Sequence, residues 1–302
     1  MQGVGGLTGF PGFASGRIPS RDVRAAHGAA VAGPYRHAWS RPLGAAGRVE
    51  IWFVPAGAHR LLAQHARILG REDWSAIARV RDENARNHLR ATRITLRRAL
   101  SHAVGNTVKP EAWRFETTAY GKPQVAAGLP QVHFCISHIE TMSVIAVSRD
   151  APVGVDIETV GQAPSTKVIE GFCSARERRA LAQLSEPERA RAFARLWTLK
   201  EAHVKLTGTG LAADFRFLEF GSGPELSTVD CQAQHTPGET CFQSWLTESP
   251  GGLCQVAVAV GGTEAVAGRG ELVCFAVEDG VDLSQSRTLN PGGGLQANLA
   301  IS

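Results

Sequence analysis

Three acidic residues and a lysine in this chain have the types and spacing that magnesium and phosphate chemistry requires. Asp156 and Glu158 stand at i and i+2 in a segment that predicts a strand, so both carboxylates point to the same side. About forty residues later, Glu201 and Lys205 stand at i and i+4 on a predicted helix, one turn after Trp197. Carboxylate oxygens suit Mg²⁺ and an ammonium suits a phosphate, so strand and helix together predict one site.

Each of the two segments also has an ordinary structural interpretation. A strand with a polar outer face would explain Asp156 and Glu158, with Val155 and Ile157 on the other face. A helix-surface ion pair, worth roughly 0.2 to 0.5 kcal/mol, would explain Glu201 and Lys205. Lys200 lies off this face of the helix and is expected in solvent. Only the combination of the two segments favours a functional site.

Further basic and polar residues could contact phosphates. The predicted helix 82–104 carries four arginines at i, i+4, i+7 and i+11, which is typical of a solvated basic face from which one or two could bind phosphate: Arg86, Arg90, Arg93 and Arg97. Ser137 and His138 follow a short apolar strand, where a lone histidine is more typical of a structural hydrogen bond. Gly121-Lys122-Pro123 alone predicts a turn with an exposed lysine.

The elements that must position these side chains follow from the hydrophobic pattern. Helices are predicted at 58–69, 82–104, 174–184 and 186–207. Strands are predicted at 49–55, 113–117, 132–137, 143–148, 154–158, 215–220, 241–246, 254–260 and 271–277.

A faint internal repeat runs through this order of elements. A long helix is followed by Arg114-Phe115, and a second long helix is followed, 102 residues later, by Arg216-Phe217. A pair of predicted strands comes after each. We therefore expect an α+β fold of two similar halves, each a small, mainly antiparallel sheet with packed helices, and an active site in the cleft between them.

Composition sets the class of protein. The chain has 302 residues, of which 43% are apolar and 20% charged, as expected of a soluble globular protein. The net charge of +4 equals that of residues 1–47, so the remainder is near neutral and does not indicate a nucleic-acid binder. Six scattered cysteines without a C-x-x-C pair favour reduced, buried thiols.

Segment boundaries and location follow from the same reading. We expect residues 1–47 to form a flexible extension rich in Gly, Ala, Arg and Pro, 48–150 and 151–278 to form the two halves, and 279–302 to form a flexible tail. A transit peptide is a second interpretation of the first segment. The sequence has no apolar run of membrane-spanning length and no secretory signal at its start, so a cytoplasmic protein is expected.

Four of these segments, in this order, resemble the 4′-phosphopantetheinyl transferases of the Sfp type. They are Gly121-Lys122-Pro123, Phe134–His138, Gly154–Glu158 and Trp197–Lys205, which reads W-T-L-K-E-A-H-V-K. The resemblance covers roughly 48–277. It implies a pseudo-dimer of two α+β halves that binds coenzyme A at their junction. The implied reaction transfers the phosphopantetheine arm to a serine of an acyl or peptidyl carrier protein and releases 3′,5′-ADP.

The resemblance also implies roles for individual residues. Asp156, Glu158 and Glu201 would be the Mg²⁺ ligands, and Glu201 would accept the serine proton directly or through water. Lys205 would stabilise the departing 3′,5′-ADP oxygen. The implied coenzyme A contacts are Arg90, Lys122, Pro123, Ser137, His138, Asp156 and Lys205, with Glu177 as a possible accessory acidic residue.

Several positions depart from the family pattern. Cys135 stands where asparagine is frequent, Ile139 where a small polar residue is usual, and Thr209 where a basic residue is common. These departures bear on the nucleotide pocket and the carrier contacts. Two other functions stay open at this point, namely an Mg²⁺-dependent pyrophosphate hydrolase and a non-catalytic module that binds coenzyme A or a carrier protein. The expected enzyme is a monomer that meets its carrier protein transiently.

Overall fold

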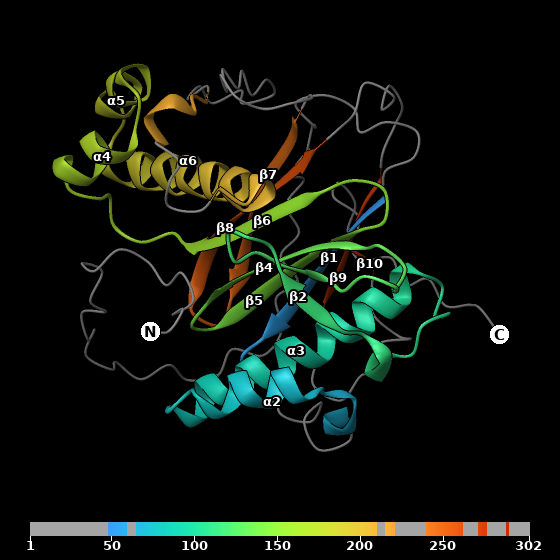
Figure 1. The fold of residues 1–302 in the computed structure, drawn as a ribbon. Helices are drawn as coiled ribbons and strands as arrows, with labels where there is room; N and C mark the ends of the chain where they lie inside the picture. The colour runs from blue at the N-terminus through green and yellow to red at the C-terminus, as the bar shows by residue number, and fades with distance from the viewer. Residues whose placement is uncertain are drawn as a thin grey trace. The chain divides into compact units, whose positions relative to one another are not determined.

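A computed structural model of the chain describes residues 48–58, 65–209, 215–220, 240–261, 271–276 and 288–289, all of which lie in the compact unit 34–302. These residues form an α+β fold, as the sequence predicts, with a five-stranded sheet of order β10-β9-β1-β5-β4, a three-stranded sheet of order β6-β8-β7 and a small hairpin of β2 and β3 (Figure 1). None of the helices among the described residues has the length and apolarity needed to cross a bilayer.

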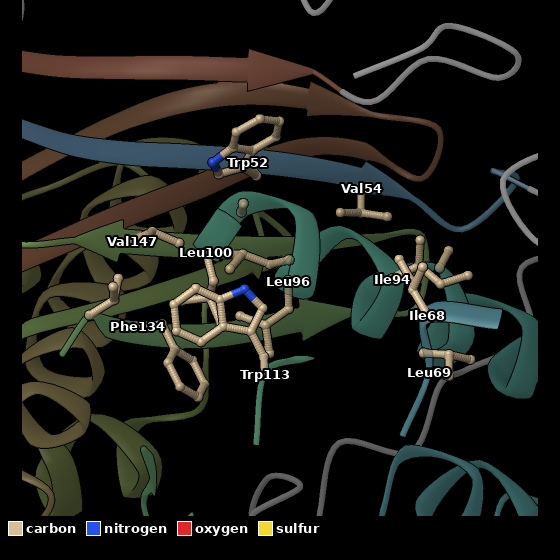
Figure 2. Packing of buried hydrophobic residues seen from close by; sticks show 14 of the residues in the cluster. Trp52, Val54, Ile68, Leu69, Ile94, Leu96, Leu100, Trp113, Phe134 and Val147 are labelled. Carbon is tan, nitrogen blue, oxygen red and sulfur yellow. The ribbon is translucent and has the colours of Figure 1, made fainter. Parts of the chain in front are cut away.

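The N-terminal half is built on β1 (Arg48–Pro55), α3 (Glu83–Ala103), β4 (His133–Ile139) and β5 (Met142–Ser148). β5 lies between β1 and β4 and is antiparallel to both. Asp82 caps α3 by accepting a hydrogen bond from the Ala85 backbone at 2.7 Å. The apolar face of α3 covers one face of this sheet, where Leu96 and Leu100 pack with Trp52 and Trp113 (Figure 2).

The C-terminal half repeats this topology. Its elements are β6 (Val153–Thr159), α6 (Glu186–Thr207), β7 (Thr240–Ser249) and β8 (Gly252–Gly261), and β8 lies between β6 and β7, antiparallel to both. In each half the helix follows the first strand and a hairpin completes the sheet. A capping box of Ser185 and Glu188 starts α6, and Gly208, in the left-handed region with φ 71°, ends it.

Three apolar clusters hold the layers together. The first lies between α3 and its sheet, and the third joins α6 to β8 and to its covering helices, α4 (Thr166–Phe172) and α5 (Ala175–Ala182). The second lies between the two sheets and contains Ile51, Val144, Val155, Ile157 and Val258. Figure 1 shows α3 on one side of the sheets and α6 on the other. Because β4 and β6 pack closely, residues of the two halves meet beside α6.

Two strands change the expected division of the chain. The range 151–278 was expected to form the C-terminal half alone, but β9 (Glu271–Ala276) pairs in parallel with β1 and so extends the N-terminal sheet. Within the expected tail 279–302, β10 (Thr288–Leu289) pairs with β9. The backbone N–H and C=O groups on the edge of β1 explain this arrangement, because an unpaired strand edge can form hydrogen bonds with a segment from elsewhere in the chain.

The other predicted elements are mostly confirmed. The long helices agree to within a residue at each end, and every predicted strand before residue 160 is present, β2 as the shorter Phe115–Thr117 with β3 (Pro123–Val125) as its partner. The prediction of a strand at 215–220 was wrong, because Phe215–Phe217 is a 3-10 helix that packs on α4. The hydrophobic pattern did not predict α2 (Arg71–Ala78) or α4. Half of the helix predicted at 58–69, residues 59–64, lies outside the described residues, and the described part shows a 3-10 turn at Ala66–Ile68.

Candidate functional site

Helix α6 lies directly against β6, and a glycine makes this contact possible. A Cβ atom on Gly154 would lie 1.9 Å from the Ala202 carbonyl oxygen and 2.6 Å from the Leu206 nitrogen. Gly154 therefore allows the last turns of α6 to approach the β6 backbone, and Asp156, two residues along, has its side chain on this side of the strand. Val155 and Ile157 point the other way, into the core between the sheets, as predicted.

Three polar side chains from three elements meet at this junction. Lys205 of α6 donates to the Asp156 Oδ1 atom at 2.5 Å and to the Ser137 Oγ atom at 2.9 Å. Ser137 of β4 donates to the same Asp156 oxygen at 2.7 Å. Asp156 is 3% exposed, whereas the Lys205 side chain is 27% exposed and so opens to solvent. The cluster joins the two halves of the fold and presents an ammonium group at its edge.

Glu158 and Glu201 lie close enough to this cluster for the charges of Asp156 and Lys205 to shift their pKa values. Burial and the negative charge of Asp156 raise the pKa of Glu158 to about 7, against the attraction of Lys205 and a hydrogen bond from the Trp197 side chain. Burial and Asp156 likewise raise the pKa of Glu201 to about 7. Burial opposes the charge on Lys205, but the Asp156 carboxylate outweighs it and raises the pKa of the ammonium. The three carboxylates thus carry more negative charge than one lysine balances.

The donor set suits a hard cation. The Asp156 Oδ2 atom is buried without a hydrogen-bond partner, and the two glutamates beside it are held at unfavourable pKa values. Within the described residues, no three His, Cys, Asp or Glu side chains already stand at metal-binding separation. Mg²⁺ prefers hard oxygen ligands such as carboxylates, waters and phosphate oxygens, so the residues present fit such an ion.

Two other predicted residues lie beside the cluster. His138 is exposed on β4 and interacts electrostatically with both Lys205 and Asp156. Desolvation and the positive charge of Lys205 lower the pKa of its imidazole. Lys122 is half-buried and donates to the backbone carbonyl oxygens of Leu206 at 2.9 Å and Val153 at 3.4 Å. The expectation of an exposed turn lysine was therefore wrong, and Pro123, the next residue, is exposed at the start of β3.

Arg90 has its contacts on the far face of the N-terminal sheet. Its guanidinium lies 5.5 Å from the ring centre of Trp74 on α2 and donates to Asn87 at 3.4 Å. The interpretation of the arginines of α3 as a solvated face, from which one or two could bind phosphate, fails for Arg97, which is buried and paired with Asp73 at 2.6 Å. This arginine fastens α2 to α3.

Glu177 belongs to a buried structural pair. Its carboxylate lies 2.6 Å from the Lys200 Nζ atom and accepts backbone hydrogen bonds from Ser174 and Phe220. Lys200 was expected in solvent, which was wrong, because α4, α5 and the 215–217 turn cover that face of α6. The ammonium also donates to the carbonyl oxygens of Phe172 and Phe215. These contacts account for both charges without a ligand.

One residue of the site, Trp197, was not among the predicted site residues. Trp197 stacks on Phe172 with ring centres 4.3 Å apart. Its side chain also hydrogen-bonds to Glu158 and so orients that carboxylate. The signal was present in the sequence, because Trp197 stands one turn before Glu201 on the same helix face.

Comparisons with known proteins match the C-terminal half most clearly. Residues 152–251 match the model of the 4′-phosphopantetheinyl transferase superfamily. The chain is 46% identical over 100 residues to a 4′-phosphopantetheinyl transferase, psf-1, of Bacillus pumilus, a match covering 32% of this chain and 41% of that protein. It is 36% identical over 99 residues to 4′-phosphopantetheinyl transferase Sfp of Bacillus subtilis, covering 33% and 43%.

A longer match extends over both halves. The chain is 27% identical over 218 residues to 4′-phosphopantetheinyl transferase HetI of a Nostoc species, a match covering 71% of this chain and 88% of that protein. The matches to the Bacillus proteins span less than half of those relatives' length. The matched region 152–251, about a third of the chain, contains Asp156, Glu158, Glu201 and Lys205 and is similar to the 4′-phosphopantetheinyl transferase superfamily.

Proposed function

We propose that this protein transfers the 4′-phosphopantetheine arm of coenzyme A to a serine of an apo carrier protein, releases 3′,5′-ADP and depends on Mg²⁺. The observation that carries the proposal is the junction of β6 and α6, where a lysine is bound to Asp156 with Glu158 and Glu201 beside it. The relatives named above carry the same activity in their names, and the matched region includes all four residues.

Asp156, Glu158 and Glu201 would hold the metal. Bound there, Mg²⁺ would neutralise negative charge on the pyrophosphate of coenzyme A. The buried, unpartnered Asp156 Oδ2 atom supports this assignment, since such an oxygen is costly to bury without a partner. The raised pKa values of both glutamates support it as well, because a cation would offset the burial and the negative charge of Asp156 that raise them.

Glu201 would serve as the general base. Its carboxylate, which lies near enough to Asp156 and Lys205 for their charges to shift its pKa, would accept the proton of the carrier serine directly or through a water. The serine oxygen then forms a bond to the phosphorus that bears pantetheine, and the bond from that phosphorus to the bridging oxygen breaks. The bridging oxygen leaves with 3′,5′-ADP, and the serine proton stays on Glu201 until solvent removes it.

Lys205 would stabilise the leaving group. The Asp156 carboxylate keeps the pKa of this ammonium raised, so the group stays charged at neutral pH and can donate to the departing phosphate oxygen. Ser137 and His138 are our candidates for further phosphate contacts, since both lie beside this ammonium. Arg90 and Pro123 stay predictions as coenzyme A contacts.

The remaining parts of the proposal concern the setting. Cys135, Cys173 and Cys254 are free and buried, which supports a protein that works in a reducing compartment such as the cytoplasm. We propose a monomer that binds its carrier protein only during transfer.

The direct test is a transfer assay against a panel of apo acyl and peptidyl carrier proteins with coenzyme A and Mg²⁺, read by intact mass. We expect the carrier to gain the pantetheine arm, and the gain to stop when the metal is chelated and return when Mg²⁺ is restored. Asp156→Asn should abolish transfer, whereas Glu140→Gln, which changes an exposed glutamate on the turn between β4 and β5, should not. Release of 3′,5′-ADP without any carrier would instead indicate a hydrolase, and no gain across the panel would refute the proposal.

A further inference from the structure

The Lys122 side chain crosses from the N-terminal half to the end of α6. The Lys122 backbone is held in the turn between β2 and β3 by two hydrogen bonds with Thr118. The Thr118 backbone nitrogen donates to the Lys122 carbonyl oxygen at 2.9 Å, and the Thr118 hydroxyl oxygen accepts from the Lys122 backbone nitrogen at 3.1 Å. Gly121 provides the positive φ of 83° that this turn requires. The turn is therefore closed by its own hydrogen bonds, and it aims one side chain at the C-terminal half.

The ammonium of Lys122 satisfies carbonyl groups that the secondary structure leaves free. The Leu206 carbonyl belongs to the last turn of α6, where carbonyl oxygens lack partners within the helix, and it accepts from the Lys122 Nζ atom at 2.9 Å. A positive charge at this end also matches the helix dipole. The second acceptor, the Val153 carbonyl oxygen at 3.4 Å, lies at the start of β6.

The methylene groups of Lys122 reinforce this contact. A Cβ on Gly208, the residue that ends α6, would lie 3.6 Å from the Lys122 Cδ atom. The methylene groups of Lys122 thus lie over the end of α6, and its ammonium group donates a hydrogen bond to the last turn of that helix. It connects the hairpin, the last turn of α6 and the first residue of β6.

These contacts lie next to the group that the proposed reaction needs. Leu206 directly follows Lys205, whose ammonium must stay on Asp156 and Ser137. A shift in the last turn of α6 would move Lys205 away from those partners. Small displacements of a catalytic group can cost about a hundredfold in rate.

We propose that Lys122 is a positioning residue, which ties the end of α6 to β6 and thereby fixes Lys205 in the site, rather than a ligand of the coenzyme A phosphates. Both bonds of its ammonium go to protein carbonyl oxygens, and burial lowers the pKa of the group, as expected of a lysine enclosed by the fold. This inference rests on the proposed function for its kinetic test, but not for its structural test.

The structural test is amide hydrogen exchange of the free protein, measured over Thr207–Thr209. Lys122→Met keeps the stem and removes the charge and its donors. We expect exchange in this segment to become about tenfold faster, which corresponds to the loss of about one hydrogen bond, while α3 stays unchanged. Lys122→Arg, which keeps a charged donor, should restore most of the protection. Lys109→Met, at an exposed lysine of the same half, is the matched control.

The kinetic test separates positioning from phosphate binding. For Lys122→Met we expect kcat to fall about tenfold to a hundredfold, with KM for coenzyme A changed by less than about twofold. A raised KM with unchanged kcat and unchanged exchange would show that Lys122 binds phosphate, and no change in any quantity would also overturn the proposal. Should Lys122→Met not fold, Lys122→Gln, which keeps a neutral donor, takes its place. If the wild-type protein transfers nothing to any carrier, the proposed function has failed and hydrogen exchange alone decides the role of Lys122.

Discussion

At the scale of single residues, the site holds two glutamates whose ionised forms are unfavourable in the folded state. Burial and the charge of Asp156 raise the pKa of Glu158 and of Glu201 to about 7, whereas a glutamate in the unfolded chain titrates near 4.3. Between these values the folded state binds protons that the unfolded state does not. The free energy of unfolding therefore falls as pH rises through this window, and the whole penalty is present above about pH 7.

This repulsion predicts the behaviour of a neutral variant. In the absence of metal, Glu201→Gln should stabilise the protein at pH 8, because it removes one of the mutually repelling charges, and should change its stability little at pH 5. Thermal unfolding across this pH range measures the effect, with Glu140→Gln as the control. Equal effects of Glu201→Gln at both pH values would contradict the assignment of repulsion to this cluster.

Residue types and spacing predicted which side chains meet at the site better than they predicted the surroundings of neighbouring residues. Asp156, Glu158, Glu201 and Lys205 could be grouped from two local patterns, because both strand and helix periodicities place side chains on known faces. The burial of Lys200 could not be predicted, since a charged residue on a helix is expected in solvent unless the segments that pack over it are known. Here those segments are distant in the sequence and also supply Glu177 as its partner.

At the scale of elements, the site depends on how closely α6 approaches β6. The contact at Gly154 leaves no room for a side chain, as the Ala202 carbonyl oxygen and the Leu206 nitrogen occupy the position of a Cβ atom. Both atoms belong to the backbone, so they can move only if the helix moves. Any displacement of α6 carries Glu201 and Lys205 away from Asp156.

We expect Gly154→Ala to destabilise the protein by about 1 to 3 kcal/mol through overpacking and to reduce transfer to a carrier at temperatures where the variant is still folded. Gly161→Ala is the matched control, because its Cβ would meet nothing within 4 Å. Denaturant unfolding and the mass assay measure the two effects. Normal transfer by a folded Gly154→Ala variant would show that the approach of α6 does not set the site.

The sequence predicted long elements accurately and short ones poorly, for reasons of packing. The bounds of α6 could be predicted because Ser185 and Glu188 form a capping box at its start and Gly208 ends the helix. The segment 215–220 reads F-R-F-L-E-F, and its first three residues alternate apolar and polar side chains as a strand does. It becomes a 3-10 turn because Phe215 stacks on Phe172 and its carbonyl oxygen accepts from Lys200, contacts that no local pattern contains.

At the scale of the whole described fold, two halves of one topology share a core. Each half alone would expose one face of a small sheet, and the cluster that contains Val144, Val155, Ile157 and Val258 buries both faces against each other. The Ser137–Asp156–Lys205 cluster lies where the edge strands of the two sheets meet. The sequence repeat foretold the two halves but not the pairing of β9 with β1, because pairing across halves has no local signal.

This shared core implies that the halves unfold together. Ile157 is 1% exposed and lies between the sheets, so Ile157→Ala should lower the free energy of unfolding by about 2 to 5 kcal/mol. Because β9 also links the C-terminal half to the N-terminal sheet, the most protected amides of α3 and of α6 should lose protection by the same factor in hydrogen exchange. Leu181→Ala, which opens a cavity beneath α5 in the C-terminal half alone, should have the same effect on both helices if unfolding is cooperative. Faster exchange in α6 with an unchanged α3 would instead mean that the halves unfold independently, and that the site is assembled only when the two halves dock.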